Sequence, residues 1–464
     1  MLAKSPRIVQ ESAVPHSCII LADGPEAFVR VGGVALLDRL LRTLQRCGMD
    51  RAIILSNTPE RVRNGLAGPA PFRSEIAIEI HERENGPVTV GAIAEVWPHH
   101  AGKMLVLRGE RAFASRLVQW IDEQEQTTTL VDSDPPDDLE ALVASAPTTT
   151  RGQICGITLL TRNWIRSRRG VFEELVREEV GNGRIEVADI ATRTWHFTSM
   201  RRELRPYWFA APAPAQQKTA MRVLLDSAQK GTLDLPAIVH APIEDWLVSR
   251  LCKTRITPNQ LTFLTNAAAW CATFLFATGR LGWGVLCALA VGVLDGLDGK
   301  QARVKMETSR GGELEHWFDA FFENSWWIAF AFFLFVSGQL PSAFAWLLLM
   351  LAAEGLAGLT KWASLHRLGV SVYELGDFDR FLRLIGARRN VHVWILAAGV
   401  LLGNPARAFV MAASWEAITS VMQTVRALWM MAKQRFTEAP SFLTSPPALE
   451  PCTGLTGVDQ SETS

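Results

Sequence analysis

The 464-residue sequence has no net charge, no paired-cysteine motif and no apolar segment near its N-terminus. Lys and Arg together number 47, as do Asp and Glu, so no overall field favours a nucleic-acid or acidic partner. The seven cysteines show no C-x-x-C motif and no metal-ligand spacing, which favours reduced structural thiols. Because the first 17 residues lack a hydrophobic segment, we expect no cleavable secretory signal.

Hydropathy divides the chain into two parts. Residues 1 to about 255 mix charged and apolar side chains as soluble domains do, whereas long runs rich in Trp, Phe, Leu and Ala begin near Gln260. The Pro-, Ser- and Thr-rich C-terminus is typical of a disordered tail. The predicted units are an N-terminal extension (1–15), a cytosolic α/β domain (16–215), connecting and interfacial helices (216–255), a membrane domain (256–435) and the tail (436–464).

The membrane domain is predicted to be all-α, with six transmembrane helices. Each crossing needs about 20 residues, and six apolar runs approach that length: 260–279, 281–303, 312–337, 341–362, 388–403 and 405–432. Lys and Arg concentrate in alternate loops, within 300–310 and 361–389, and such loops favour the cytoplasmic side. We therefore expect a multi-pass protein of the cell (inner) membrane with both termini in the cytoplasm.

The segment "APIEDWLVSRLCKT" before the first crossing is predicted to form an amphipathic helix. A helix of this kind lies in the plane of the membrane interface, with its apolar face among the lipids. The apolar side is predicted to comprise Ile243, Trp246, Leu247, Val248 and Leu251.

Four acids stand where the second crossing ends and the third begins. Asp295 and Asp298 are three residues apart, and Glu315 and Asp319 are four apart, so each pair shares one face of its helix. Carboxylates this close need protons or cations to neutralise them, and Mg²⁺ or Mn²⁺ bind both oxygen ligands and phosphates. A single such acid would be an ordinary solvated helix end. Four together predict a metal site at the membrane surface.

Small and cationic residues accompany the first acid pair. Gly296 and Gly299 would leave the helix surface open to a bulky ligand. Lys300 and Arg303 would supply positive charge for phosphate oxygens. The combination predicts metal-assisted phosphoryl transfer.

The run "DGLDGKQAR" resembles the first half of the signature of CDP-alcohol phosphatidyltransferases, D-x-x-D-G-x-x-A-R, without a mismatch. The family signature continues, after eight residues, with G-x-x-x-D-x-x-x-D. In this chain a spacing of eight places His316 and Ala320 at the acid positions, whereas a spacing of seven places Glu315 and Asp319 there. We favour the shorter spacing, because a loop accommodates a one-residue deletion readily. His316 stays an alternative ligand or proton-transfer group.

The resemblance implies an enzyme that displaces CMP from a CDP-linked lipid or alcohol with a second alcohol, using two divalent ions (Mg²⁺ or Mn²⁺). It implies metal ligation by Asp295, Asp298, Glu315 and Asp319. Asp319, or His316 in its place, would also be the catalytic base. Glycerol phosphate, inositol phosphate and ethanolamine- or serine-like acceptors share this signature. Membrane lipids are expected partners, and the family implies a homodimer.

The nucleotide subsite is also implied by the resemblance. "ITPNQLTFL" resembles the motif that opens the first crossing in this family, near the nucleotide. The implied nucleotide contacts are Asn259, Thr262, Gly299, Ala302 and Arg303. The first two have the alternative role of starting the helix after Pro258. Three cations on the cytoplasmic face before the fifth crossing are candidates to bind an acceptor phosphate: Lys361, Arg388 and Arg389. Their alternative role is to set topology or touch lipid headgroups.

The N-terminal part reads as strand, loop, helix, strand from "SCIILADGPEAFVRVGG" onward, typical of a doubly wound α/β domain. Its order resembles sugar-phosphate nucleotidyltransferases. The phosphate-binding loop of that family is shortened here, Glu26 stands near the position of its lysine, and Glu110 replaces a metal-binding aspartate. Arg30 is the only nearby cation. Because an acid cannot replace a cation beside a triphosphate, we expect this fold without its activity.

Two alternatives to the membrane transferase stay open. One is a bifunctional enzyme that also makes its CDP-alcohol from CTP, as fused inositol-phosphate cytidylyltransferase/di-myo-inositol-phosphate phosphate synthases do. The other is a non-catalytic membrane scaffold, which the irregular second half of the signature would suit.

Overall fold

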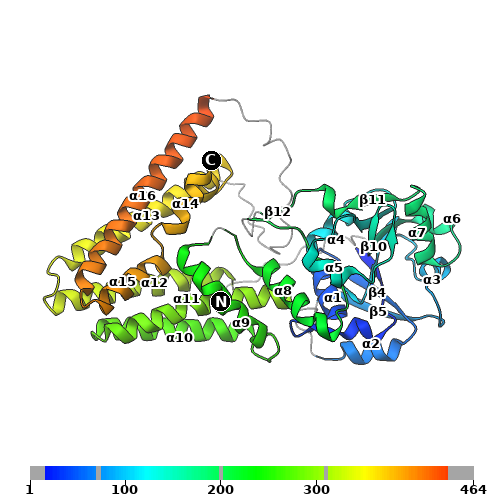
Figure 1. Ribbon diagram of the computed structural model, residues 1–464, viewed down its shortest axis with the longest axis horizontal. Coiled ribbons are helices and arrows are strands. Elements are labelled where there is room, and N and C mark those ends of the chain that lie inside the picture. The colour runs from blue at the N-terminus through cyan, green and yellow to red at the C-terminus, as the bar shows by residue number, and fades with distance from the viewer. Residues whose placement is uncertain (1–15, 69–74, 198–201, 232, 308–311, 437–464) are drawn as a thin grey trace, which may run out of the picture.

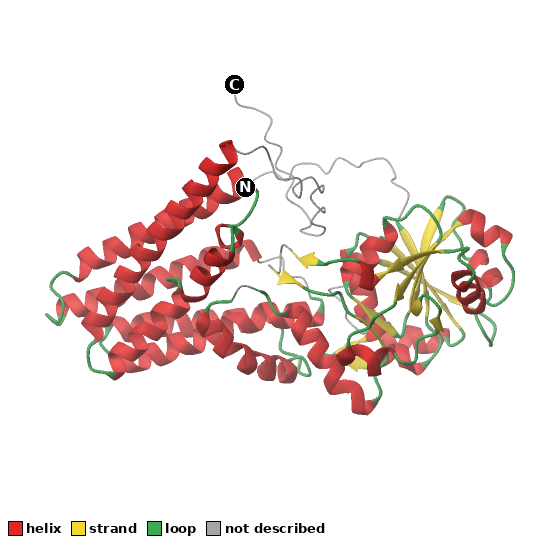
Figure 2. Ribbon diagram, turned by 45° about the horizontal axis from the view of Figure 1, so that its top comes forward, coloured by secondary structure: helices red, strands yellow, loops and turns green. Residues whose placement is uncertain are grey.

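The computed structural model describes residues 16–68, 75–197, 202–231, 233–307 and 312–436. The predicted N-terminal extension (1–15) and all but the first residue of the predicted tail (436–464) lie outside these residues. An α/β domain lies at one end of the molecule and a helical region at the other, with helices α8 and α9 between them (Figures 1 and 2). The predicted division into two parts is therefore present.

The α/β domain is built on a mixed sheet with strand order β11-β8-β10-β6-β1-β4-β5. Its strands are β1 (Ser17–Leu21), β4 (Arg51–Ser56), β5 (Ala77–Glu82), β6 (Lys103–Arg108), β8 (Thr128–Asp132), β10 (Gly152–Thr161) and β11 (Glu186–Asp189). Strand β1 pairs in parallel with β4 and β6, whereas β10 runs antiparallel to both β6 and β8. The predicted strand–helix–strand start is confirmed, and β10 is the departure from a uniformly parallel sheet.

Helices cover both faces of this sheet, so its central strands are buried on both sides. In β1, Cys18 and Ile20 pack on one face, and Ile19 and Leu21 pack on the other. The first face is covered by α1 (Leu36–Arg46), α2 (Pro59–Leu66), α4 (Ser115–Asp122) and α5 (Asp137–Val143). The second is covered by α3 (Val90–Glu95), α6 (Arg162–Ser167) and α7 (Phe172–Gly181). Short strands complete the domain: β2 (Arg30–Val31), β3 (Val34–Ala35), β7 (Arg111–Phe113), β9 (Thr148–Thr149), β12 (His196–Phe197), β13 (Arg202–Glu203) and β14 (Trp208–Ala210).

Helices α8 (Gln217–Ala228) and α9 (Leu235–Leu251) connect the two parts. The predicted amphipathic helix is present as α9, but its predicted apolar side is divided. Val248 is buried in the core of the α/β domain, whereas Ile243 and Trp246 are 48% and 58% exposed. The reason is that α9 packs against α11 on one side and leaves its other side uncovered. The exposed stripe has helical spacing and comprises Leu235, Ile238, Val239, Ile243 and Trp246.

Each of the six predicted apolar runs forms a helix. They are α10 (Pro258–Ala277), α11 (Leu281–Lys305), α12 (Gly312–Val336), α13 (Ala343–Leu368), α15 (Arg389–Leu401) and α16 (Pro405–Phe436), with α14 (Asp377–Ile385) between α13 and α15. Within the described residues, α11 and α13 are long and apolar enough to cross a membrane. Thr257 caps α10 by accepting a hydrogen bond from the backbone N of Gln260, and Pro258 occupies its first turn. The predicted helix start at Pro258 is confirmed.

Candidate functional site

Helix α11 presents two of the predicted metal ligands near its C-terminal end. Asp298 is only 5% exposed. Its Oδ2 accepts a hydrogen bond from Thr262 Oγ1 (2.7 Å), and its Oδ1 accepts one from the backbone N of Gly299 (2.6 Å). Asp295 forms an ion pair with Arg389 of α15. The fold thus brings Thr262 and Arg389, both predicted site residues, onto the two aspartates.

Two neighbouring residues of α11 serve the packing of α9. A Cβ added to Gly296 would lie 2.5 Å from Glu244 Oε1, so this glycine makes room for α9. The Lys300 side chain is buried, forms an ion pair with Asp245 and donates to the side chain of Gln229. These contacts correct the expectations that Gly296 opens the helix to a ligand and that Lys300 faces phosphate oxygens.

The other predicted nucleotide contacts differ in their surroundings. Asn259 is exposed in the first turn of α10. Arg303 donates through Nε to the backbone carbonyl of Ala228 (2.8 Å), and its Nη1 would lie 3.1 Å from a Cβ at Gly299. Ala302 is half-buried beside Arg303. Arg303 and Gly299 therefore lie together on α11, on the turn that follows Asp298.

The three predicted acceptor cations separate in the structure. Arg389 lies at the signature helix through its ion pair with Asp295. Arg388 Nε lies 3.6 Å from Asp234 Oδ2, at the start of α9. The ammonium of Lys361 lies 5.9 Å from the centre of the Tyr373 ring. Of the three, Arg389 is the one that pairs with a predicted metal ligand among the side chains that the structure describes.

The second half of the signature opens helix α12. Glu315, His316 and Asp319 lie in its first turns, but the side chains of 312–321 lie outside the described part of the structure. Residues 308–311, which contain the questioned spacing, also lie outside it. Glu315 and Asp319 are one helical turn apart and share a face of α12. Their roles stay predictions.

The described donors at this site fit a hard divalent cation. Asp295 and Asp298 offer carboxylate oxygens one turn apart, the donor type that Mg²⁺ and Mn²⁺ prefer. The side chains described in the structure contain no group of three or more His, Cys, Asp or Glu suited to a metal ion. A complete set would need the carboxylates of α12.

Sequence reasoning overlooked a buried acid of α9. Glu244 is buried beside Gly296 and lies 3.8 Å from the ammonium of Lys300. Burial raises the pKa of Glu244 to about 7, and the charge of Lys300 opposes that rise. The sequence feature that could have revealed Glu244 is an acid inside an apolar helical run, "PIEDWLV".

Sequence reasoning also overlooked a contact between the α/β domain and the end of α11. This contact is formed by three arginines on one face of α1: Arg39, Arg42 and Arg46. They donate to the backbone carbonyls of Val304 (2.7 Å), Lys305 (2.8 Å) and Glu307 (3.0 Å), respectively. The last carbonyls of a helix lack partners within it and carry partial negative charge, which cations stabilise. The α/β domain therefore holds the C-terminal end of the signature helix.

The aspartate of the shortened loop, Asp23, has its partner within the α/β domain. Asp23 forms an ion pair with Arg83 (2.6 Å), whose side chain is buried. Glu26, which stands near the expected lysine, is exposed. No cation of the loop itself faces this position within the described residues.

The remaining residues of the predicted nucleotide site are also engaged within the domain. Glu110 accepts from Arg108 Nε (2.7 Å). The guanidinium of Arg30 contacts the carbonyl of Gly33 (3.5 Å). Both side chains are therefore engaged by residues of the α/β domain itself.

Comparisons with known proteins agree with the signature. The family model described as CDP-alcohol phosphatidyltransferase matches residues 255–436. A Thermococcus kodakarensis protein named bifunctional IPC transferase and DIPP synthase is 25% identical over 347 residues, which cover 67% of this chain and 74% of that protein. An Aquifex aeolicus protein of the same name is 24% identical over 432 residues, covering 89% and 94%.

Among solved structures, the Mycobacterium tuberculosis phosphatidylinositol phosphate synthase with CDP-DAG bound aligns with a TM-score of 0.32 and 19% identity. That alignment covers 42% of this chain and 94% of the other. The family match, by contrast, contains every helix from α10 to α16 and the aspartates of α11. Residues 255–436, behind the α/β domain, therefore match the CDP-alcohol phosphatidyltransferase family, and the match and the enzyme names of the relatives support a phosphotransferase.

Proposed function

We propose that this protein is an integral-membrane CDP-alcohol phosphatidyltransferase of phospholipid or phosphodiester biosynthesis. It would transfer the phosphatidyl or phosphoalcohol group of a CDP-linked donor to an alcohol acceptor and release CMP. One observation carries the proposal. Inside the matched region, Asp298 accepts a hydrogen bond from Thr262 of α10 and Asp295 pairs with Arg389 of α15, so two helices converge on the signature of α11.

In the proposed reaction, the acceptor oxygen forms a bond to the β-phosphorus while the bond to the bridging oxygen of CMP breaks. Asp319, or His316 in the alternative spacing, takes the proton of the acceptor hydroxyl. Arg389 and Arg303 supply positive charge for the phosphate oxygens. Thr262 orients the Asp298 carboxylate through its hydrogen bond.

The proposed metal ligands are Asp295, Asp298, Glu315 and Asp319, holding two Mg²⁺ or Mn²⁺ ions. Such ions, when bound, neutralise the charge of the diphosphate. Asp298 suits this role because its oxygens are held in place by two hydrogen bonds.

We place the helices from α10 to α16 in the inner membrane, with six crossings, cytoplasmic termini and a homodimeric assembly. Large apolar side chains point outward from these helices, as lipid contact requires. Phe263, Trp283 and Leu401 are 77%, 67% and 86% exposed. CDP-linked donors and membrane lipids would reach the site from this surface.

We propose that the α/β domain does not transfer nucleotides, because Asp23 and Glu110 are paired with arginines of the same domain. The names of the relatives favour the second candidate, a bifunctional enzyme that also makes its CDP-alcohol from CTP. Incubation with CTP and inositol 1-phosphate separates the two. We expect no pyrophosphate release, and metal-dependent release would overturn the assignment.

The transferase test is CMP release by the detergent-purified full chain with Mg²⁺ or Mn²⁺, CDP-diacylglycerol or CDP-inositol, and a panel of alcohols and phospho-alcohols. Asp298→Asn and Asp319→Asn are the test variants. Glu60→Gln, an exposed acid of α2, is the control. We expect release that needs the metal, persists in the control and is lost in both test variants.

The outcomes decide which residue is the catalytic base and whether the protein is a transferase or a scaffold. Activity that survives Asp319→Asn but not His316→Ala would assign the base to His316 and the longer spacing. No CMP release from a folded wild-type protein with any acceptor would refute the transferase and favour the scaffold.

A further inference from the structure

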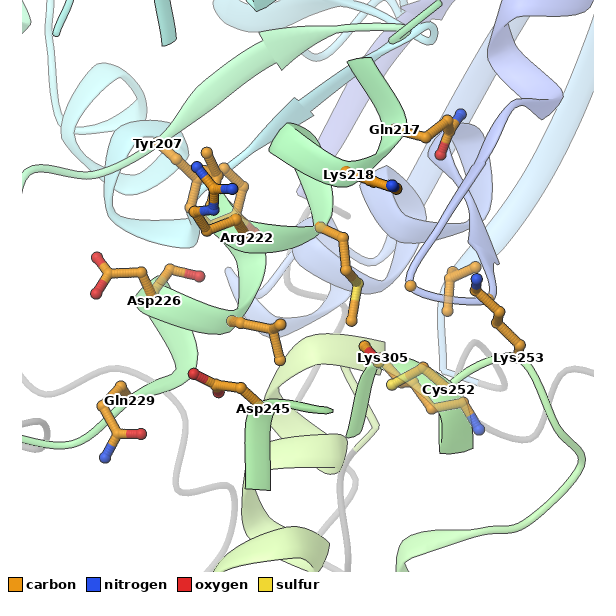
Figure 3. Close-up of a pocket in the computed structure, with 18 of the residues that line it drawn as sticks. Tyr207, Gln217, Lys218, Arg222, Asp226, Gln229, Asp245, Cys252, Lys253 and Lys305 are labelled. Carbon is orange, nitrogen blue, oxygen red and sulfur yellow. The ribbon is translucent and has the colours of Figure 1, made fainter. Parts of the chain in front are cut away.

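A cleft of about 1640 Å³ lies between the α/β domain and the connecting helices (Figure 3). Its walls come from the β2–β3 hairpin, the start of α5, residues 204–207, helices α8 and α9, and the segment 252–255. The cleft contains neither the aspartates of α11 nor the shortened loop at Asp23. Apart from Arg30, the cleft contains none of the predicted catalytic, metal-binding or nucleotide-binding residues of either site described above.

The acids that line this cleft are mostly neutralised by partners within the protein. Asp226 pairs with Arg202 (3.2 Å), and Asp245 pairs with Lys300. Glu307 lies 3.3 Å from the ammonium of Lys305. Among the lining acids, this leaves Asp138, which forms no ion pair with any residue that the structure describes.

The lining cations are in the opposite situation. Four exposed cations form no ion pair or hydrogen bond through their side chains with any residue that the structure describes: Lys218, Arg222, Lys253 and Arg255. Arg30 reaches only the carbonyl of Gly33 (3.5 Å), and Arg250 stacks on Trp246 (5.4 Å to the ring centre). The cleft therefore holds a clear excess of unpaired positive charge.

The cations lie on different walls. Figure 3 shows Lys218 and Arg222 on α8 and Lys253 across the cleft from them. Like charges that face each other across a concave surface raise the local concentration of anions. Phosphate groups, with several acceptor oxygens, are the anions that Lys and Arg bind best.

We propose that this cleft is a binding site for phosphate groups, distinct from the carboxylate site on α11. Its position gives two sources for the phosphate. Trp246 lines the cleft and belongs to the exposed apolar stripe of α9, so lipid headgroups can reach it. The opposite wall belongs to the α/β domain, so a soluble phosphate compound is the second source.

The cleft also shares a wall with the signature helix. Asp245 and Gln229 line it, and both hold the buried ammonium of Lys300, two residues from Asp298. A phosphate compound bound here is thus adjacent to the transferase domain without touching its aspartates.

The test is a titration of the detergent-purified full chain in EDTA, followed by microscale thermophoresis. One arm uses sodium pyrophosphate, and the other uses detergent micelles doped with phosphatidylglycerol or, for comparison, phosphatidylcholine. The cleft variant is Lys218→Gln with Arg222→Gln. The matched control is Arg61→Gln with Arg177→Gln, which removes two exposed cations elsewhere in the α/β domain.

We expect the cleft variant to bind about tenfold more weakly than the control in at least one arm. Weaker binding of pyrophosphate by the cleft variant assigns a soluble ligand to the cleft. Weaker binding of phosphatidylglycerol micelles assigns a lipid headgroup. Asp298→Asn should bind like the wild type, so the result does not depend on transferase activity. Equal binding by the cleft variant and the control in both arms would overturn the proposal.

Discussion

Replacing Arg39 by methionine should detach the α/β domain from the end of α11. Arg39 is fully buried and donates to the carbonyls of Val31 (2.8 Å) and Val304 (2.7 Å). Each hydrogen bond from a charged donor contributes about 1.5–3 kcal/mol. Part of that loss is offset because a buried cation is itself costly to desolvate. We expect a net destabilisation of about 2–4 kcal/mol, since two buried carbonyls lose their donor.

Thermal unfolding of the purified full chain, followed by intrinsic fluorescence, measures this effect. A loss of this size should lower Tm by at least about 4 °C. Arg61→Met, an exposed arginine of α2, is the control and should leave Tm unchanged. The Tm of Arg39→Lys should lie between those of Arg39→Met and the control, because an ammonium cannot reproduce the fork of a guanidinium that donates to two carbonyls.

The same variant reports on function. Arg39 holds the helix that carries Asp298, so CMP release by Arg39→Met should fall even at temperatures where the protein stays folded. A variant with wild-type Tm and wild-type CMP release would refute the idea that α1 positions α11.

Three further changes test the surroundings of α11. Gly296→Ala should lower Tm, because its Cβ would lie 2.5 Å from Glu244 Oε1; Gly282→Ala, with open space around it, is the control. Thr262→Val should reduce CMP release without changing Tm greatly, whereas Thr262→Ser should retain it, since Ser keeps the hydrogen bond to Asp298. The pKa of Glu244 is raised from 4.5 to about 7, so the folded state favours the protonated carboxyl. The contribution of this proton to folding stability is complete below pH 4.5 and is lost as pH rises through 7. The Tm of Glu244→Gln relative to wild type, measured in EDTA, should therefore increase from pH 5 to pH 8; a constant difference would contradict this.

Local patterns predicted much of the architecture. The apolar runs from 260 to 432 predicted the six helices, because the length and hydropathy of a run are properties of consecutive residues. The spacing of Asp295 and Asp298 placed both acids on one helical face for the same reason. Thr262 was named from a resemblance and Arg389 from its place on the cytoplasmic face, and the structure brings both to those aspartates.

What the sequence by itself determined was the division into two parts, the helices, the strand–helix–strand start and the signature on α11. Only the tertiary structure decided which charged side chains find partners inside the protein. Lys300 looked like a phosphate ligand until α9 placed Asp245 beside it. Arg39 donates to the carbonyl of Val304, which lies 265 positions away along the chain. Such pairings depend on how distant segments pack, and neither periodicity nor spacing along the chain carries that information.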